Sequence, residues 1–447
     1  MTVFVFVASL CGAMALGMPI AFALVVCGVV LMTWMVQIGI YPAFDAQVIA
    51  QKMLNGADSF ILLAIPFFIL AGELMNAGGL SRRIIHFAQT LVGHWRGGLG
   101  YVTIIAAVIL ASLSGSAAAD TAALAAILVP MMRGAGYNQR RSLGLVAAGG
   151  IIAPVIPPSI GFVVFGVAAN VSIPQLFIAG LVPGILLGLS LILAWRYIAQ
   201  REETGAILPR CSARERWQAT KDGAFALAMP AFILGSIRLG WATPTEAAVV
   251  ATVYALSIGM FVYGELKVKH LFGIFLSAAK LTAMIMFLVS AALISSWLIT
   301  AANIPAEIGE LLAPLADNQT LLLVVILAMV LVISTSLDFT PTVLILTPVL
   351  MPVVKQAGIE PVYFGVLFII VNAIGLITPP VGVVLNVVSG VAKVPMTEVI
   401  KGVVPFHMAQ TATMFLLVAW PPLVMAPFRF LSGRISFIAM IQQLFGS

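Results

Sequence analysis

The fold of this chain is decided by residues 112–120, which read Ser-Leu-Ser-Gly-Ser-Ala-Ala-Ala-Asp. These small, hydroxylated and acidic residues interrupt an apolar run that extends from Leu99 to Met132. A helix needs about 20 apolar residues to cross a bilayer, and each arm of the run is shorter than that. The pattern therefore predicts a re-entrant helical hairpin over about 97–135, with its tip near the centre of the membrane.

The same pattern returns later in the chain. A shift that superimposes Ser114 on Ser336 also superimposes Pro130 on Pro352, and it aligns the hairpin tip with Ser-Thr-Ser-Leu-Asp-Phe-Thr-Pro-Thr at 334–342. Self-similarity of this kind indicates two structural repeats. We predict a first repeat at 1–195, a linker at 196–222, a second repeat at 223–430 with its hairpin at about 319–357, and a C-terminal tail at 431–447.

Each repeat also contains a double proline, Pro157-Pro158 in the first and Pro379-Pro380 in the second. Proline has no N–H, so carbonyl groups of the preceding turn lose their partners. The pattern predicts helices broken over about 141–170 and 363–391. In hydrocarbon an unpaired backbone group costs several kcal/mol, so such breaks persist only where protein, water or an ion satisfies them.

The composition agrees with a chain that lives in lipid. Of 447 residues, 62% are hydrophobic and 9% are charged, and the mean hydropathy is +1.14. Soluble domains are about 45–50% apolar and about 25% charged. We therefore predict an all-α membrane protein with about 10–11 transmembrane helices. The first apolar run carries Gly17-Met18-Pro19, which predicts that it is split into two short helices.

The distribution of charge predicts the orientation of the repeats. The net charge of +6 comes from basic residues at helix ends, which indicates membrane topology and no nucleic-acid partner. Basic residues bracket the first hairpin, whereas mixed charges bracket the second. The first bracket is His94, Arg96, Arg133, Arg140 and Arg141, and the second is Asp317, Lys355 and Glu360. The positive-inside rule then predicts inverted repeats and a cytoplasmic linker.

Oxygen atoms from a hairpin tip and a helix break suit a hard cation, so we predict two sodium sites and no other cofactor. The first site comprises Ser114, Gly115, Ser116, Ile156, Pro157 and Ser159. The second comprises Ser336, Leu337, Asp338, Thr340, Thr378, Pro379 and Gly382. Acidic and hydroxyl groups at membrane depth are functional candidates, so Ser116, Asp120, Asp338 and Thr340 are expected near the substrate. Helix N-termini at the same breaks would favour an anionic substrate.

Structural roles stay open for these motifs. Ser-Gly-Ser and alanine-rich runs also pack helices together in membranes, and a double proline can be a simple kink. Asp120 can instead cap the second arm of the first hairpin. We expect Asp120 and Asp338 to be equivalent in the two repeats. This symmetry suits a carrier better than an intramembrane protease, and no His-Glu-x-x-His or nucleotide-binding phosphate loop occurs, so we expect no enzyme.

Six segments of the chain form a recognisable set: 66–76 (Pro-Phe-Phe-Ile-Leu-Ala-Gly-Glu-Leu-Met-Asn), 114–120, 157–159, 243–247, 340–348 and 378–382. In these segments, and over nearly its whole length, the chain resembles the large membrane subunit of tripartite ATP-independent periplasmic (TRAP) transporters. The resemblance implies a bacterial inner-membrane protein of the ion-transporter superfamily fold, in which sodium drives an elevator movement. It also implies a small four-helix membrane subunit and a periplasmic binding protein that delivers an organic acid, here of the sugar-acid (2,3-diketogulonate) or C4-dicarboxylate class. The alternative is a stand-alone sodium/dicarboxylate carrier without a binding protein.

Overall fold

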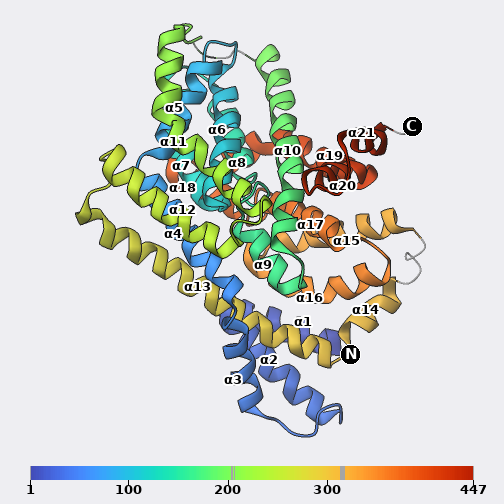
Figure 1. Ribbon diagram of the computed structural model, residues 1–447. Helices are drawn as coiled ribbons and strands as arrows, with labels where there is room; N and C mark the ends of the chain where they lie inside the picture. Colours follow the sequence, from blue (N-terminus) through green and yellow to red (C-terminus); the bar gives the residue numbers. More distant parts are fainter. Residues whose placement is uncertain (1, 203–204, 206, 313–317, 446–447) are drawn as a thin grey trace.

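The computed structural model describes residues 2–202, 205, 207–312 and 318–445. Every regular element in these ranges is a helix, which confirms the predicted fold class (Figure 1). Eight helical stretches in the described ranges are long and apolar enough to span a bilayer. They are Ile20–Gln37, Phe60–Ala77, Ala117–Gly134, Ile173–Arg201, Pro244–Val262, Val268–Ala301, Phe339–Gln356 and Met396–Ala419.

One group of helices, which we call the framework, occupies the left side and the lower part of Figure 1. It consists of α1 (Thr2–Ala15), α2 (Ile20–Gln37), α3 (Ala46–Ala57), the 3₁₀ turn η1 (Phe60–Leu63), α4 (Ala64–Ala77), α5 (Leu80–Val92), α11 (Ala213–Arg238), α12 (Pro244–Ser257), the π-helical turn η2 (Ile258–Val262), α13 (Val268–Ala301) and α14 (Ile304–Leu312). Helix α13 packs along α2, α3 and α4, while α12 packs on α4 and α11 on α5. The gap between α1 and α2 confirms the predicted split at Gly17-Met18-Pro19.

A second group, which we call the hairpin body, packs against the framework. It consists of α6 (Gly98–Ser114), α7 (Ala117–Gly134), α8 (Gln139–Gly150), α9 (Ile160–Ala169), α10 (Ile173–Arg201), α15 (Gln319–Ser334), α16 (Phe339–Gln356), α17 (Pro361–Gly375), α18 (Val383–Ala392) and α19 (Met396–Ala419). Two short helices follow, α20 (Pro422–Leu431) and α21 (Phe437–Phe445). Because α19 packs on α8, α16 on α9 and α18 on α7, the two halves of the chain interlock in one body.

Two helix–turn–helix units form the predicted hairpins. In the first, α6 ends at Ser114, and the next residue, Gly115, has a φ of +62°, in the left-handed region that glycine adopts at little cost. The Ser116 hydroxyl then caps α7 by accepting the Ala119 N–H. In the second, Asp338 is the N-cap of α16, and its carboxylate accepts the Phe339 N–H at 2.7 Å. In each hairpin, therefore, a polar N-cap starts the second arm.

Each double proline lies where a helix is interrupted. Helix α8 ends at Gly150 and α9 begins at Ile160, while α17 ends at Gly375 and α18 begins at Val383. The peptide bonds Pro157-Pro158 and Pro379-Pro380 are both cis. The structure therefore has a helix break at both double prolines, as predicted.

The polar segment predicted as a linker is helical over most of its length. Helix α10 continues to Arg201 and α11 starts at Ala213, so the described connection between them is shorter than 196–222. A capping box starts α11, because Ser212 accepts the Glu215 N–H and Glu215 accepts the Ser212 N–H. The latter hydrogen bond lowers the pKa of the Glu215 carboxyl. Polar residues here form the first turns of a helix, since strong N-capping outweighs the polar composition.

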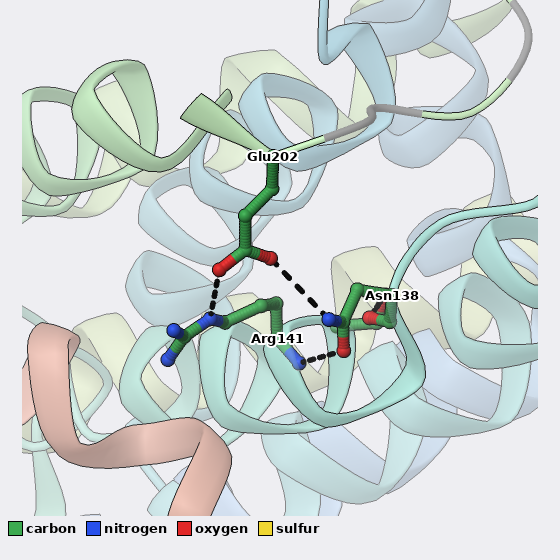
Figure 2. Close-up of polar contacts among 4 residues, drawn as sticks. Asn138, Arg141 and Glu202 are labelled. Carbon is green, nitrogen blue, oxygen red and sulfur yellow. Dashed lines mark hydrogen bonds and ion pairs between the residues drawn. The ribbon is translucent and has the colours of Figure 1, made fainter. Parts of the chain in front are cut away.

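The basic helix ends gather at one end of the hairpin body. Figure 2 shows Glu202, just after α10, accepting hydrogen bonds from the Arg141 Nε at 2.8 Å and the Asn138 Nδ2 at 3.3 Å. The Trp195 indole N–H donates to the Gly97 carbonyl oxygen at 2.8 Å, which ties α10 to the start of α6. In Figure 1, α6 and α7 lie in the upper half and α14 and α16 in the lower half. Inversion of the repeats, their boundaries and re-entry into a bilayer stay predictions.

Candidate functional site

A cavity of about 390 Å³ lies between the hairpin body and the framework. Residues from both hairpin tips, both helix breaks, α2 and α13 line it. The volume falls in the range of about 300–1,000 Å³ that is typical of small-molecule sites. Since each repeat contributes one tip and one break, the cavity is the place where the two halves of the chain meet.

Five helices begin at this cavity. Helices α7, α9, α16, α18 and α2 all place residues of their first turn in its lining, among them Ala117, Ile160, Phe339, Val383 and Ile20. The first N–H groups of a helix have no partner within the helix, and the helix dipole makes that end positive. In the described part of the chain, Asp338 is the only charged residue of the lining. Helix ends, and no lysine or arginine, therefore supply positive potential here.

The first predicted sodium site is assembled by contact between a hairpin tip and a helix break. A Cβ atom added to Gly115 would lie 2.6 Å from the Pro158 carbonyl oxygen and 2.9 Å from Ser159 Cα. Ser159 holds the break together, because its hydroxyl donates to the Pro154 carbonyl oxygen and accepts the Phe162 N–H. The first tip thus lies directly against the Pro158 carbonyl oxygen of the first break.

Asp120 lies beneath this tip and not in the cavity lining. The Ser114 hydroxyl donates to one oxygen of its carboxylate and accepts the Ser116 N–H at 3.1 Å. The side chain is buried, and its second oxygen, Oδ2, has no hydrogen-bond partner in the described structure. Because Ser116 occupies the N-cap of α7, Asp120 is not the cap. A buried carboxylate oxygen without a donor is suited to receive a cation.

The second predicted site is built in the same way. The Val381 N–H of the second break donates to the Thr335 carbonyl oxygen of the second tip at 3.3 Å. The Thr378 hydroxyl donates to the Ile374 carbonyl oxygen at 2.8 Å and lies 2.9 Å from His407 Nε2. A tip and a break of the same repeat are again in contact, and a histidine from α19 supports them.

The predicted residues fall into two groups in the structure. Gly115, Ser116, Asp338 and Thr340 line the cavity. The remaining predicted residues lie at or next to the tips and breaks without lining the cavity, namely Ser114, Asp120, Ile156, Pro157, Ser159, Ser336, Leu337, Thr378, Pro379 and Gly382. Binding of sodium by these residues stays a prediction.

The expected equivalence of Asp120 and Asp338 is wrong. Ser116 and Asp338 are the two N-caps of the second hairpin arms, so they occupy the same place in the repeats. Asp120 corresponds instead to Thr342, whose hydroxyl donates to the Asp338 carbonyl oxygen at 2.9 Å. Asp338 is the N-cap of its arm, whereas Asp120 lies four residues after the N-cap Ser116. The two repeats therefore place their carboxylates differently, with Asp338 in the cavity lining and Asp120 beneath the tip.

The sequence reasoning did not single out three polar residues near the site, of which Asn372 and Gln410 are buried and His407 is half-buried. Asn372 Nδ2 donates to the Phe339 carbonyl oxygen at 2.9 Å, and Gln410 Nε2 donates to the Ala148 carbonyl oxygen at 2.9 Å. The side-chain oxygens Asn372 Oδ1 and Gln410 Oε1 are buried without a partner in the described structure. His407 is the third. Each is a polar residue inside an apolar run, the same signal that revealed the hairpin tips.

Transition-metal chemistry finds no support in this geometry. Among the described residues, no group of three or more His, Cys, Asp and Glu side chains could hold a metal ion. Sodium differs because carbonyl and hydroxyl oxygens suffice for a hard monovalent cation. The oxygens gathered at the tips and breaks are of these kinds.

Comparison with known proteins agrees with the architecture. The family model described as the tripartite ATP-independent periplasmic transporter, DctM component, matches residues 7–423. The chain is 50% identical over 435 residues to the 2,3-diketo-L-gulonate TRAP transporter large permease protein YiaN of Escherichia coli strain K12, covering 97% of this chain and 100% of that protein. It is 36% identical over 410 residues to the sialic acid TRAP transporter large permease protein SiaM of Vibrio cholerae serotype O1, covering 92% and 94%.

A solved structure shares the fold. The crystal structure of the Alcanivorax borkumensis YdaH transporter, described as having an unusual topology, superposes with a TM-score of 0.65 at 14% sequence identity. The superposition covers 90% of this chain and 97% of that one. At this identity the likeness concerns the fold alone.

Proposed function

The chain belongs to the DctM family of tripartite ATP-independent periplasmic transporters, and from this premise we propose that it imports an organic acid with sodium as the coupling ion. It is a multi-pass large permease of the bacterial inner membrane. The proposed substrate is a sugar acid or a C4-dicarboxylate. The names of YiaN and SiaM, which refer to sugar acids, support the first of these classes.

The observation that carries the proposal is the cavity at which five helices begin. A helix N-terminus stabilises a nearby anion by about 0.3–1 kcal/mol at exposed positions and by up to about 2 kcal/mol when partly buried. Several such ends acting together suit a carboxylate substrate without requiring a basic side chain. A cavity of about 390 Å³ accommodates a small organic acid.

Asp338 provides a physical reason for coupling to sodium. Its carboxylate lies in the cavity lining and repels an anionic substrate. Two like charges 4 Å apart interact by about 4 kcal/mol at an effective dielectric constant of 20. A sodium ion bound beside Asp338 at the second hairpin tip removes this repulsion. In this mechanism, therefore, sodium binds first and the anion binds to the neutralised site.

The walls of the cavity support an elevator movement. One wall comes from the hairpin body and the other from α2 and α13 of the framework, so sliding of one past the other exposes the site to either side. Delivery by a periplasmic binding protein and pairing with a small four-helix membrane subunit complete the proposal, as expected for a TRAP large permease. The protein is thus a carrier and not an enzyme.

Uptake into proteoliposomes tests the proposal. Vesicles contain the chain and its small partner, and they receive labelled sugar acids or C4-dicarboxylates with or without a sodium gradient and the binding protein. We expect uptake only when both are present. We expect Asp338→Asn and Ser116→Ala to raise the sodium concentration for half-maximal uptake at least about tenfold, which is about 1.4 kcal/mol.

Matched controls come from helix N-caps elsewhere in the chain. Asp45 caps α3 and Ser212 caps α11, both away from the cavity. Asp45→Asn and Ser212→Ala should therefore keep the sodium dependence of the wild type. Uptake by the chain without a binding protein would favour the stand-alone carrier, and uptake indifferent to sodium would refute the coupling.

A further inference from the structure

A second cavity lies at the basic end of the molecule, between α5, α11 and the turn η2. Its volume is about 710 Å³. It is separate from the central cavity, since the two share no lining residue. Helix α7 closes its inner side with Ile127 and Met131. The proposed transport mechanism makes no use of this space.

One ion pair fixes the floor of this cavity. Arg83 Nη1 lies 2.7 Å from Glu265 Oε1 and donates to the Gly79 carbonyl oxygen at 3.0 Å. The Arg83 guanidinium also stacks on the Tyr263 ring, 3.7 Å from its centroid. Arg83 and Glu265 therefore satisfy each other, and neither supplies net charge to a ligand.

The other charged lining residues leave one positive charge. Arg82 and Lys221 contribute two positive charges and Asp222 one negative charge, and the exposed His86 of α5 also lines the cavity. Asp222 already accepts a hydrogen bond from the Gln218 side chain at 3.1 Å. A phosphodiester carries a single negative charge and offers oxygens for a planar guanidinium and an ammonium. The cavity thus has the charge and the donors for one phosphodiester.

Apolar side chains form most of the remaining lining, which also includes Gln89. Ile85, Phe225 and Val262 lie beside the charged groups. Val262 is 50% exposed and the adjacent Phe261 is 82% exposed, so the apolar lining continues onto the outer surface of the protein. A surface of this kind on a membrane protein faces acyl chains. An inorganic phosphate or a nucleotide has no acyl chain to contact this apolar surface, whereas a phospholipid contacts the charged groups with its headgroup and the apolar surface with its acyl chains.

The position of the cavity along the membrane normal also suits a phospholipid. Helix α5 buries Leu80, Ile84 and Ala88 and turns Arg82 and His86 outward, which is the pattern of a helix at the membrane interface. The neighbouring helix ends are basic, so the positive-inside rule predicts that this is the cytoplasmic side. Basic pockets between helices on that side bind anionic lipid headgroups.

We propose that this cavity binds the headgroup of one anionic glycerophospholipid, of the phosphatidylglycerol type, with its phosphodiester on Arg82 and Lys221. Asp222 is placed to accept a hydrogen bond from a headgroup hydroxyl. Because α7 belongs to the hairpin body and the remaining walls to the framework, the lipid contacts both groups of helices.

Lipid binding by the purified two-subunit membrane complex tests this inference. The delipidated complex is titrated in detergent with phosphatidylglycerol, phosphatidylethanolamine, the soluble headgroup glycerophosphoglycerol and inorganic phosphate, and bound lipid is counted by native mass spectrometry. We expect one tightly bound phosphatidylglycerol and about tenfold or greater weakening in the double variant Arg82→Gln/Lys221→Gln. The control Arg214→Gln/Lys269→Gln removes the same charge from exposed positions outside the cavity and should bind like the wild type.

Each other outcome contradicts the inference. Equal weakening in both double variants would mean nonspecific attraction to the basic surface. Equal binding of phosphatidylethanolamine would remove the requirement for net negative charge, and equal binding of inorganic phosphate would show a free-anion site. The result does not depend on transport, so a failure here leaves the proposed carrier function intact.

Discussion

Substituting Gly115 by alanine tests whether contact between the first tip and the first break is essential. A left-handed backbone at a non-glycine residue costs roughly 1–2 kcal/mol, and Gly115 has a φ of +62°. A Cβ there would also lie 2.6 Å from the Pro158 oxygen, a backbone atom that cannot move alone. Overpacking of this kind costs about 1–3 kcal/mol more. The variant should therefore be destabilised by about 2–5 kcal/mol, with the tip pushed away from the break.

Thermal unfolding of the detergent-solubilised two-subunit complex, with sodium titrated against choline, measures both consequences. A ligand that binds only the folded state stabilises it by about 2.7 kcal/mol at a concentration 100 times its Kd. If the first tip and break hold sodium, Gly115→Ala should lose a large part of the sodium-dependent rise in Tm as well as basal stability. This measurement requires no substrate and no binding protein.

Gly240→Ala is the matched control. Gly240 has a φ of +73°, but no atom lies within 4 Å of an added Cβ, so the control carries the backbone cost without the clash. We expect it to be destabilised by roughly 1–2 kcal/mol and to keep its full response to sodium. If Gly115→Ala behaves like Gly240→Ala in both respects, the argument for a sodium site at this contact is refuted.

Two further predictions concern movement and positioning. Met284 of α13 and Thr340 of α16 line the same cavity from opposite walls. In a variant that lacks the native cysteines and carries Met284→Cys and Thr340→Cys, cross-linking with a cleavable bifunctional thiol reagent should stop uptake, and cleavage of the cross-link should restore it. Unimpaired uptake by the cross-linked protein would exclude the elevator movement. His407→Ala should raise the sodium KM about threefold to tenfold with less effect on kcat, because Thr378 loses a hydrogen-bonding partner. His407→Gln, which keeps a polar side chain, should have a sodium KM closer to that of the wild type. A sodium KM that stays unchanged in His407→Ala would mean that His407 is structural.

The hairpins and helix breaks were predictable because their signals are local. A polar tip such as Ser114–Ser116 inside an apolar run, or a double proline, changes backbone hydrogen bonding within a few residues, and the structure places α6, α7, α15 and α16 around those tips. The start of α11 was equally readable, since Ser212 and Glu215 have the spacing of a capping box. The polar composition of 196–222 instead led to the prediction of a linker, although α11 starts within this segment.

The supporting polar groups were not predictable from spacing. Gln410 bonds to Ala148, which is 262 positions away, and Thr378 bonds to His407 of another helix. No periodicity connects such pairs, because packing between the two halves of the chain brings them together. The same holds for the outer wall of the cavity, which α2 and α13 supply from the framework.

The difference between the two N-caps bears on how one fold can couple an anion to a cation. Ser116 and Asp338 begin equivalent helices on the same cavity, yet only Asp338 brings a charge. If both positions carried a carboxylate, two negative charges would repel the anionic substrate. If neither did, the helix N-termini would attract the anion even in the absence of sodium. In the proposed mechanism, with one carboxylate in the cavity and Asp120 buried beneath the other tip, a single bound sodium would change the electrostatic potential that the substrate meets. Asymmetry at one position of the repeat would therefore supply a physical basis for the proposed coupling to sodium.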